Sequence, residues 1–271
     1  MLIGAMKSGT TALSESLSAH PEVCFSTIKE PGFFNTTANW HAELDRYHRL
    51  FDPAPGQLCA EASTMYTRLQ DWPQTAERLY AYNPELKLIY IMRHPVQRMI
   101  SHYAHRKGHG HKTLPPEQAL LRNPGYINTS RYALQLRPYL ELFGREQVLP
   151  LIFEQYLHDP AATLTTVAEF LDIDPTGFSA QDAKQPKNPS VGQLRWHPRL
   201  GQLKRHEPWR TLGRNTPEGL RNALRRVFGV RLDRKPAVSP ELRTLLWRFV
   251  EDDVKAVEEL IGRELTEWRD G

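Results

Sequence analysis

The sequence Leu2-Ile3-Gly4-Ala5-Met6-Lys7-Ser8-Gly9-Thr10-Thr11-Ala12-Leu13 predicts the end of a buried strand, a tight turn and the first turn of a helix. Gly4 and Gly9 can adopt backbone conformations closed to other residues, so that consecutive N–H groups can point inward and surround an anion. The N-terminus of the helix adds unpaired N–H groups and the positive end of its dipole. Charge and hydroxyl donors come from Lys7, Ser8, Thr10 and Thr11. We therefore predict a phosphate-binding loop, the plainer alternative being an ordinary strand–turn–helix with a capped helix.

The position of the lysine distinguishes this loop from that of nucleoside triphosphatases. Their pattern is G-x-x-x-x-G-K-[ST], and Gly4, Gly9 and Thr11 match its spacing. Thr10, however, occupies the position of the lysine, and Lys7 precedes the second glycine. A lysine so placed would not reach a γ-phosphate in the usual way. A P-loop nucleotide kinase or ATPase is therefore the alternative and not the preferred interpretation.

Apolar runs that suit strands alternate with helical patterns along the chain. The most apolar run, Leu86 to Met92, predicts a central parallel strand. Further strands are expected at 23–26, 56–61 and 148–153, and helices at 13–19, 74–82, 95–103, 132–143 and 160–171. This alternation predicts an α/β fold with a central parallel sheet of about five strands flanked by helices. Ligands bind such sheets at the carboxyl ends of the strands.

The region from 174 to 240 differs from the rest, because it is basic and rich in proline and tryptophan. We expect a largely irregular flap here, with a helix near 217–227. The apolar spacing from Pro240 to Ile261 then predicts one long amphipathic helix, 240–262, that packs on the domain. No internal repeat is present, and the 271 residues are expected to form a single domain, 1–271.

Composition limits the partners and the compartment. A net charge of +4 and a pI near 9.0 suit an anionic ligand as well as nucleic acid. Nucleic acid ranks low because no recognised nucleic-acid module with stacking aromatics is present. Cys24 and Cys59 are expected to be strand residues in a reducing compartment, without a disulfide framework. No apolar run is long enough to span a membrane and no signal peptide precedes the first strand, so that a cytoplasmic location is expected.

A second group of polar residues follows the central strand, in Arg93-His94-Pro95-Val96-Gln97-Arg98-Met99-Ile100-Ser101-His102-Tyr103. Arg93 ends the strand, and Ser101 lies about two turns into the next helix. Arginine offers phosphate a bidentate fork, and serine adds a hydrogen bond. A nucleoside triphosphatase would usually carry an acidic residue at a strand end to hold magnesium, and Arg93 argues against that class. The plainer alternative is an arginine that caps the helix beside a surface serine.

Four segments together resemble those of sulfotransferases that use 3′-phosphoadenosine 5′-phosphosulfate (PAPS), of the bacterial and glycan type. Lys7 to Thr11 looks like their 5′-phosphosulfate loop, and Arg93 to Tyr103 is similar to R-x-P-x-x-R-x-x-S-x-Y. Lys29-Glu30-Pro31-Gly32-Phe33-Phe34 resembles E-x-x-F-F, and Glu61-Ala62-Ser63-Thr64-Met65-Tyr66 is similar to G-E-A-S-x-x-Y. The resemblance covers most of the chain and implies a fold like that of P-loop kinases.

The resemblance also implies roles for single residues. The 5′-phosphosulfate of PAPS would be bound by Lys7, Ser8, Gly9, Thr10 and Thr11. The 3′-phosphate would be bound by Arg93 and Ser101, with Arg98 structural and with Lys187 or Arg195 closing over the nucleotide from the flap. Glu30 would act as the general base that takes the proton of the acceptor. Lys7 would stabilise charge on the leaving 3′,5′-diphosphoadenosine (PAP).

The acceptor stays open among glycan, lipid, peptide tyrosine and secondary metabolite, and between a hydroxyl and an amine. Family members that act on heparan-type glycans have a lysine in place of Ala62, so that its absence argues against a heparan-like acceptor. Glu61 or Ser63 either lines the acceptor pocket or caps a strand end. Lys29 either neutralises the sulfuryl oxygens or pairs with Glu30, and in the plainer interpretation Glu30 is only part of such a surface pair.

Two further alternatives concern metal binding and catalysis. Histidines that could suggest zinc are His102, His105, His109 and His111. Sulfuryl transfer needs no metal, and no cysteine or acidic ligand adjoins these histidines, so that we expect a solvated loop on the acceptor side and no metal. A nucleotide-binding or basic adaptor module without catalysis is the alternative to an enzyme. The sequence does not indicate the oligomeric state.

Overall fold

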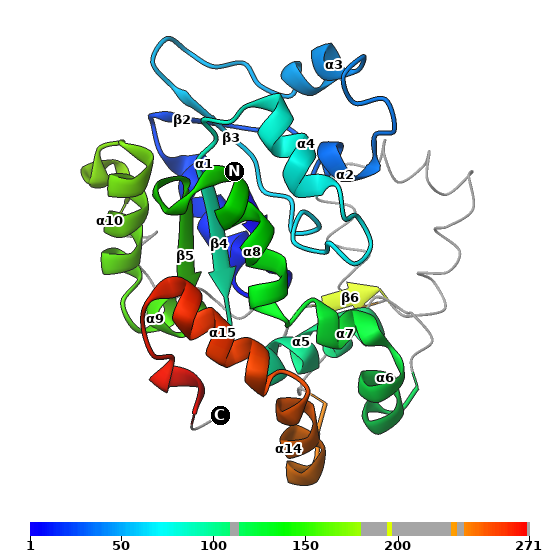
Figure 1. Ribbon diagram of the computed structural model, residues 1–271. Coiled ribbons are helices and arrows are strands. Elements are labelled where there is room, and N and C mark those ends of the chain that lie inside the picture. Colours follow the sequence, from blue (N-terminus) through cyan, green and yellow to red (C-terminus); the bar gives the residue numbers. More distant parts are fainter. Residues whose placement is uncertain (109–113, 180–193, 197–228, 232–235, 270–271) are drawn as a thin grey trace. The chain divides into compact units, whose positions relative to one another are not determined.

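The computed structural model describes residues 1–108, 114–179, 194–196, 229–231 and 236–269 (Figure 1). The expectations for Lys187, His109, His111 and a helix near 217–227 lie outside the described residues. Contacts divide the chain into two units. The larger unit consists of residues 1–98, 127–187 and 247–271, and the smaller unit of residues 99–126 and 188–246. The expected single domain stays a prediction.

The larger unit is built around a parallel sheet of three strands in the order β1-β4-β5. Their bounds are β1 (Leu2–Gly4), β4 (Leu88–Met92) and β5 (Val148–Ile152). All five residues of β4 are buried, as expected for the central strand of a parallel sheet. Leu88 pairs with Val148 and Met92 with Ile152, so that β4 and β5 end together. The predicted α/β fold with a parallel sheet is confirmed.

The expected sheet of about five strands is not confirmed, because the described strands of the larger unit divide into a sheet of three and a separate pair. β2 (Val23–Phe25) and β3 (Leu58–Ala60) form a separate parallel pair, in which Cys24 lies opposite Cys59. Beyond β3 the chain touches β1 at a single bridge between Leu2 and Ala62. Because Tyr66 N–H bonds the carbonyl of Ser63, the chain turns after this bridge and pairs no further. Both cysteines are strand residues, as expected.

Helices cover both faces of the three-stranded sheet (Figure 1). Alternate residues of β4 serve the two faces: Tyr90 and Met92 belong to one apolar cluster, and Ile89 and Ile91 belong to the other. The helices of this unit are α1 (Thr10–Ala19), α2 (Phe33–Thr36), α3 (Leu44–His48), α4 (Thr75–Tyr82), α8 (Tyr132–Phe143), α9 (Phe153–His158), α10 (Pro160–Leu171) and α15 (Glu251–Ile261). Single 3-10 turns lie at Arg145–Gln147, Pro175–Gly177 and Thr266–Trp268.

The start of α8 is capped by a residue distant in sequence. The carboxylate of Asp253, in α15, accepts hydrogen bonds from the N–H groups of Ala133 at 3.0 Å and Leu134 at 3.1 Å. These N–H groups belong to the first turn of α8 and have no partner within the helix. Burial raises the pKa of Asp253, and the two bonds from the helix oppose that rise. The C-terminal segment is therefore tied to the helix that packs on the sheet.

In the smaller unit the described part of the expected flap contains regular structure. β6 (Leu194–Trp196) pairs antiparallel with β7 (Gly229–Arg231), and the expectation of a largely irregular flap is not confirmed. The unit also takes in the part of α5 (Pro95–Gly108) from residue 99, α6 (Pro116–Arg122) and the start of α7 (Pro124–Asn128). Among the described residues, no helix has the length and apolar character needed to cross a membrane.

The expected long helix near the C-terminus is two helices. α14 (Pro240–Arg248) is separated by two residues from α15, which begins at Glu251. Val250 has φ −126° and ψ −6°, outside the helical region, and its N–H bonds the carbonyl of Trp247. Three acidic residues, Glu251, Asp252 and Asp253, open the second helix, where they favour a helix N-terminus. The sequence pattern predicts a single helix because the apolar periodicity continues across the break.

Candidate active site

The loop between β1 and α1 has the predicted strand–turn–helix form. Lys7 and Gly9 adopt left-handed conformations, with φ of 73° and 95°. Ser8 N–H closes the turn on the carbonyl of Ala5 at 3.1 Å, and Ala5 N–H bonds the carbonyl of Ile91 in β4 at 2.8 Å. Helix α1 begins at Thr10, directly after Gly9. The loop therefore leaves the carboxyl end of β1 and presents the N-terminus of α1 at the edge where parallel sheets bind ligands.

Phe153, the first residue after β5, lies against this loop. A β-carbon built on Gly9 would be 2.5 Å from Cδ2 of the Phe153 ring. The guanidinium carbon of Arg93 lies 5.0 Å from the centroid of the same ring. Sequence reasoning did not single out Phe153. Its position directly after an apolar strand, where the other site residues also stand, is the signal that could have found it.

Arg93 extends from the end of β4 to the loop. Its Nη1 donates to the carbonyl oxygen of Lys7 at 3.4 Å. The backbone carbonyl of Arg93 accepts a hydrogen bond from the hydroxyl of Tyr132 at 2.6 Å. The side chain is buried, with the residue 8% exposed, and its Nε has no hydrogen-bond partner among the described residues. Burial lowers the pKa of Arg93, while the nearby carboxylate of Glu154 opposes that shift. A buried, incompletely bonded guanidinium beside a glycine-containing loop is suited to an anion.

Arg98 also contacts the loop, but it is enclosed by protein. The residue has no exposed surface, and burial lowers its pKa to about 10. Its Nε donates to Ser130 Oγ at 2.5 Å, and its Nη1 to the carbonyl oxygen of Met6 at 3.4 Å. Arg93 and Arg98 thus bond successive carbonyls of the loop. The contacts of Arg98 fit the structural role that the sequence resemblance implies for it.

Ser101 belongs to the smaller unit, where it is buried in α5 with 3% of its surface exposed. Its position relative to Arg93 stays a prediction, as does the role of Lys187, which lies outside the described residues. In the same unit, the ring of His102 contacts that of Tyr126 edge to face at 4.8 Å. No group of three or more histidine, cysteine or acidic residues that could hold a metal occurs among the described residues.

The Glu30 segment is attached to the segment that follows β3. Glu30 and Gly32 both have positive φ, 52° and 56°. Gly32 N–H donates to Ser63 Oγ at 2.9 Å, and Thr64 Oγ1 donates to Glu30 Oε2 at 3.4 Å. Both Lys29 and Glu30 are exposed, and the described structure records no ion pair between them. The contacts of Glu30 are therefore to the 61–66 segment and not to its neighbour.

The 61–66 segment in turn lies beside β1. Leu2 N–H bonds the carbonyl of Glu61 at 2.8 Å, and Thr67 Oγ1 donates to the carbonyl of Ile3 at 3.1 Å. A β-carbon on Gly4 would be 2.0 Å from Thr67 Oγ1, so that only glycine fits where the loop begins. Ala62 is buried in the apolar cluster that contains Leu2, and it brings no charge to the site. The Glu30 segment and the loop are thus connected through the end of β3.

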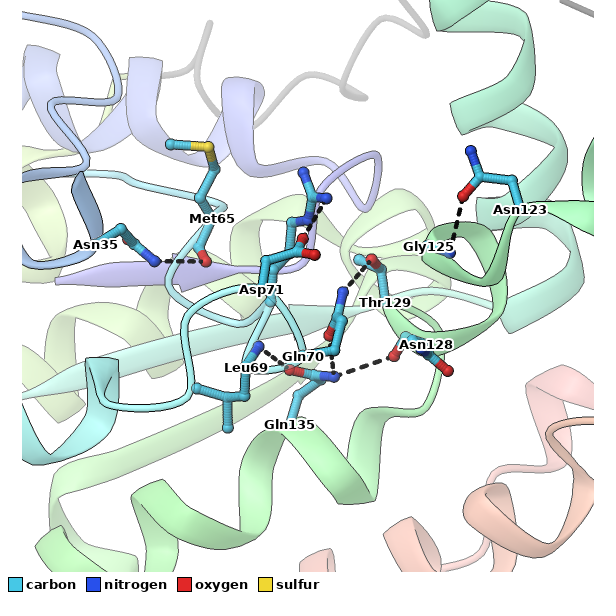
Figure 2. A network of polar contacts seen from close by, with 11 residues as sticks. Asn35, Met65, Leu69, Gln70, Asp71, Asn123, Gly125, Asn128, Thr129 and Gln135 are labelled. Atoms are coloured by element: carbon cyan, nitrogen blue, oxygen red, sulfur yellow. Dashed lines mark hydrogen bonds and ion pairs between the residues drawn. The ribbon is translucent and has the colours of Figure 1, made fainter.

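Farther along, a buried glutamine holds the loop that continues this segment (Figure 2). Gln135, from α8, accepts from the N–H of Leu69 at 2.9 Å and donates to Gln70 at 3.0 Å and to the carbonyl of Asn128 at 3.1 Å. Asn35 donates to the carbonyl of Met65 at 3.2 Å (Figure 2). Both the oxygen and the nitrogen of the Gln135 side-chain amide therefore make hydrogen bonds. The residues from Met65 to Gln70 are thereby fixed from two sides.

A cavity of about 780 Å³ lies elsewhere in the larger unit. Its lining includes Met1 and Lys87, which stand at the amino ends of β1 and β4, together with Leu58. Lys7, Glu30 and Arg93 are not among its lining residues. The site expected from the sequence lies at the opposite ends of these strands.

The site consists of a glycine-containing loop between a parallel strand and a helix, with an arginine at the end of the neighbouring strand of the sheet beside it. Such an arrangement is typical of α/β proteins that bind phosphorylated ligands. Comparison with known proteins makes the class specific. A family model described as "Sulfotransferase domain" matches residues 1–193, and the chain belongs to this family of transferase enzymes.

Several curated relatives are glycan sulfotransferases. Mouse heparan sulfate glucosamine 3-O-sulfotransferase 3B1 is 33% identical over 184 residues, which are 64% of this chain and 45% of that protein. Human heparan sulfate glucosamine 3-O-sulfotransferase 6 is 29% identical over 233 residues, 74% of this chain and 65% of that protein. The match to mouse bifunctional heparan sulfate N-deacetylase/N-sulfotransferase 4 is 29% over 203 residues, 65% of this chain and 22% of that protein. The chain spans about half or less of the length of most of these relatives.

Solved structures agree with this assignment. A sulfotransferase from Alicyclobacillus acidocaldarius superposes with a TM-score of 0.67 and 26% identity, covering 99% of this chain and 97% of that one. Mouse sulfotransferase SULT7A1 in complex with PAP gives a TM-score of 0.51 at 16% identity, covering 94% of this chain and 83% of that one. The second likeness shows the fold alone.

Proposed function

We propose that this protein transfers a sulfuryl group from PAPS to a hydroxyl or amine acceptor. The observation that carries the proposal is the guanidinium of Arg93, buried 3.4 Å from the Lys7 carbonyl with an unbonded Nε. It joins the loop after β1 to the end of β4, so that two anionic groups of one donor could be bound side by side. Membership of the sulfotransferase family supports a transferase, and PAP is bound in one structural neighbour.

The proposed donor-binding residues divide between its two phosphate ends. The loop, Lys7 to Thr11, binds the 5′-phosphosulfate through N–H groups, hydroxyls and the N-terminus of α1. Arg93 binds the 3′-phosphate together with Ser101, and Lys187 closes over the nucleotide. The orphaned Nε of Arg93 is the feature of this chain that fits a phosphorylated donor.

In the proposed reaction the acceptor oxygen or nitrogen forms a bond to sulfur as the bond from sulfur to the bridging phosphate oxygen breaks. Glu30 takes the proton of the acceptor, and PAP leaves with the electron pair of the broken bond. Lys7 stabilises the charge that grows on the bridging oxygen. Positioning and electrostatics supply most of the catalysis, as they do in phosphoryl transfer, and no metal is required.

For the acceptor we propose a carbohydrate hydroxyl or amine ahead of lipids and other small molecules. The printed names of the relatives include both O- and N-sulfotransferases of heparan sulfate. Ala62 contributes no cation, which favours an acceptor with less negative charge than heparan. The cytoplasmic location expected from the sequence stays a prediction.

Two measurements on the whole chain test the proposed function. Calorimetric titration should show tighter binding of PAP than of ATP with magnesium, and tighter ATP–magnesium binding would indicate a kinase or ATPase instead. Transfer of labelled sulfate from PAPS to a panel of glycan, amine, lipid and phenol acceptors should give a labelled product. PAP binding without transfer to any acceptor would indicate a binding module that does not catalyse.

A further inference from the structure

We propose that Glu61 and Ser63 are positioning residues that fix the catalytic carboxylate of Glu30. The inference rests on the proposed function, because Glu30 acts as a general base only in that reaction. Neither residue contacts the expected donor loop through its side chain in the described structure. Both are nearly inaccessible, with 1% of each residue exposed. Their position in a chain of hydrogen bonds that ends two residues from Glu30 indicates what they do.

The chain of hydrogen bonds has three members. Ser63 Oγ–H donates to Glu61 Oε2 at 2.7 Å. Gly32 N–H then donates to Ser63 Oγ at 2.9 Å. Ser63 therefore acts as donor and as acceptor at once, and it transmits the fixed position of Glu61 to the backbone of the Glu30 segment. The Glu61 end is itself fixed, because its backbone carbonyl bonds Leu2 of β1 at 2.8 Å.

The Glu30 segment needs such an attachment. Glu30 has φ 52°, in the left-handed region that residues with a β-carbon avoid. A conformation of this kind is unfavourable and persists only when the surroundings determine it. Gly32 is also left-handed, at φ 56°, and its N–H is the group that Ser63 accepts. Loss of that bond would let the segment relax and move the Glu30 carboxylate.

The carboxylate at position 61 keeps Ser63 in the right orientation. Besides Ser63, the hydroxyls of Tyr66 and Tyr47 donate to Glu61 Oε1, at 2.7 and 3.2 Å. An ionised carboxylate accepts all of these bonds, and hydrogen bonds to a charge are stronger than neutral ones. The Ser63 proton is thereby committed to Glu61, and an oxygen lone pair stays available for Gly32. Burial raises the pKa of Glu61, and the hydrogen bonds from Ser63, Tyr66 and Tyr47 oppose that rise.

The test compares variants on and off this path. Ser63→Ala removes the acceptor of Gly32 N–H, and Ser63→Cys keeps the size of the side chain but weakens both of its bonds. Tyr47→Phe, the control, removes a different donor to the same carboxylate and leaves the bond to Gly32. We expect kcat to fall roughly 10- to 100-fold in Ser63→Ala, and less in Ser63→Cys, because a misplacement of about 1 Å can cost about 10²-fold in rate. Calorimetric affinity for PAP should stay within about twofold of wild type, and Tyr47→Phe should keep kcat within about threefold.

A double-mutant cycle separates positioning from general support of the fold. In a Glu30→Gln background, Ser63→Ala should lower the residual kcat no further, because its effect passes through the Glu30 carboxylate. An equal fall of kcat in both backgrounds, or a parallel loss of PAP affinity, would overturn the inference. If Ser63→Ala does not fold, the same cycle with Ser63→Cys decides. A wild-type chain that transfers no sulfate to any acceptor would refute the proposed function, whereas normal kcat in a folded Ser63 variant would refute only the positioning role.

Discussion

The ring of Phe153 lies directly against the backbone of Gly9. A β-carbon at position 9 would stand 2.5 Å from Cδ2 and 2.6 Å from Cε2 of that ring. Phe153 in turn contacts the guanidinium of Arg93, so that the loop, the end of β5 and the end of β4 meet around one aromatic side chain. A change at Gly9 should therefore affect both the fold and the donor site.

Gly9→Ala tests this contact, with Gly56→Ala as its matched control. Both glycines have positive φ, 95° and 85°, but nothing lies within 4 Å of a β-carbon at Gly56. The left-handed conformation alone should cost Gly56→Ala about 1–2 kcal/mol. Gly9→Ala should lose roughly 1–3 kcal/mol more through overpacking, and PAP affinity as well. Urea unfolding and calorimetry measure both, and equal losses of stability in the two variants would contradict the contact.

Arg93→Lys should weaken the binding of PAP while the chain stays folded. Lysine keeps the charge but loses the planar fork that grips a phosphate and lies over the Phe153 ring. Hydrogen bonds to charged groups contribute about 1.5–3 kcal/mol, which corresponds to a roughly 10- to 100-fold rise in Kd. Arg137→Lys, at an exposed position of α8, is the control and should leave the Kd unchanged. Equal Kd values for the two variants would remove Arg93 from the donor site.

Lys7→Ala should nearly abolish turnover. The proposed role of Lys7 is to stabilise charge that develops on the leaving oxygen, and loss of one such donor typically costs about 2.7–4 kcal/mol of barrier. We therefore expect kcat to fall by a factor of about 10² to 10³. Lys255→Ala, on the exposed face of α15, provides the control in the same labelled-sulfate assay. Turnover at the wild-type rate would show that another group stabilises the leaving oxygen.

The stability of Glu61→Gln should rise relative to wild type as pH increases. Burial raises the pKa of the Glu61 carboxyl above its ordinary value of 4.5. The folded chain therefore binds this proton more tightly than the unfolded chain does, and wild-type stability falls as pH rises from about 4.5 through the raised pKa. Glutamine does not titrate and lacks this slope. Urea unfolding of both proteins between about pH 4 and pH 7 makes the comparison, and parallel curves would mean that Glu61 ionises as readily as in the unfolded chain.

Asp253→Ala should destabilise the larger unit by roughly 0.5–2 kcal/mol, the usual effect of losing a helix cap. The expected cause is the release of the N–H groups of Ala133 and Leu134 at the start of α8. Asp252→Ala is a matched control, since the side chain of Asp252 is 98% exposed. It should change the free energy of unfolding by less than about 0.5 kcal/mol. If the two alanine variants are equally stable, the cap contributes nothing measurable.

Local patterns predict much of this fold. The glycines and hydroxyls after β1 indicate the loop, and the apolar run before Arg93 indicates the central strand, because each signal is contained in neighbouring residues. The same reasoning finds β2 and β3 but not their pairing as a separate sheet, because these strands are only three residues long and their pairing depends on where the chain turns. It also joins α14 to α15, because Phe249 and Val250 continue the apolar spacing while the acidic residues that follow mark a new helix.

The parts of the candidate site that the sequence does not predict depend on long-range contacts. Gln135 bonds Gln70 and Leu69, which lie 65 and 66 positions earlier in the sequence. Asp253 bonds Ala133 across 120 positions. No periodicity in a single element indicates such partners. The sequence shows the residue types of the 61–66 segment, but their arrangement as a buried hydrogen-bonded path to Gly32 depends on the fold. The roles of Lys7, Glu30, Arg93, Ser101 and Lys187 stay predictions.

The division of the larger unit into three stretches of chain has a consequence during synthesis. Val254 and Trp268, from the third stretch, belong to the same apolar cluster as Tyr90 and Met92 of the central strand. A nascent polypeptide released as far as residue 246 therefore carries the phosphate-loop sequence and β4 but lacks part of the core that surrounds them. The donor site should mature only after α15 has left the ribosomal tunnel, and ribosome-bound intermediates stalled before that point should have no affinity for PAP.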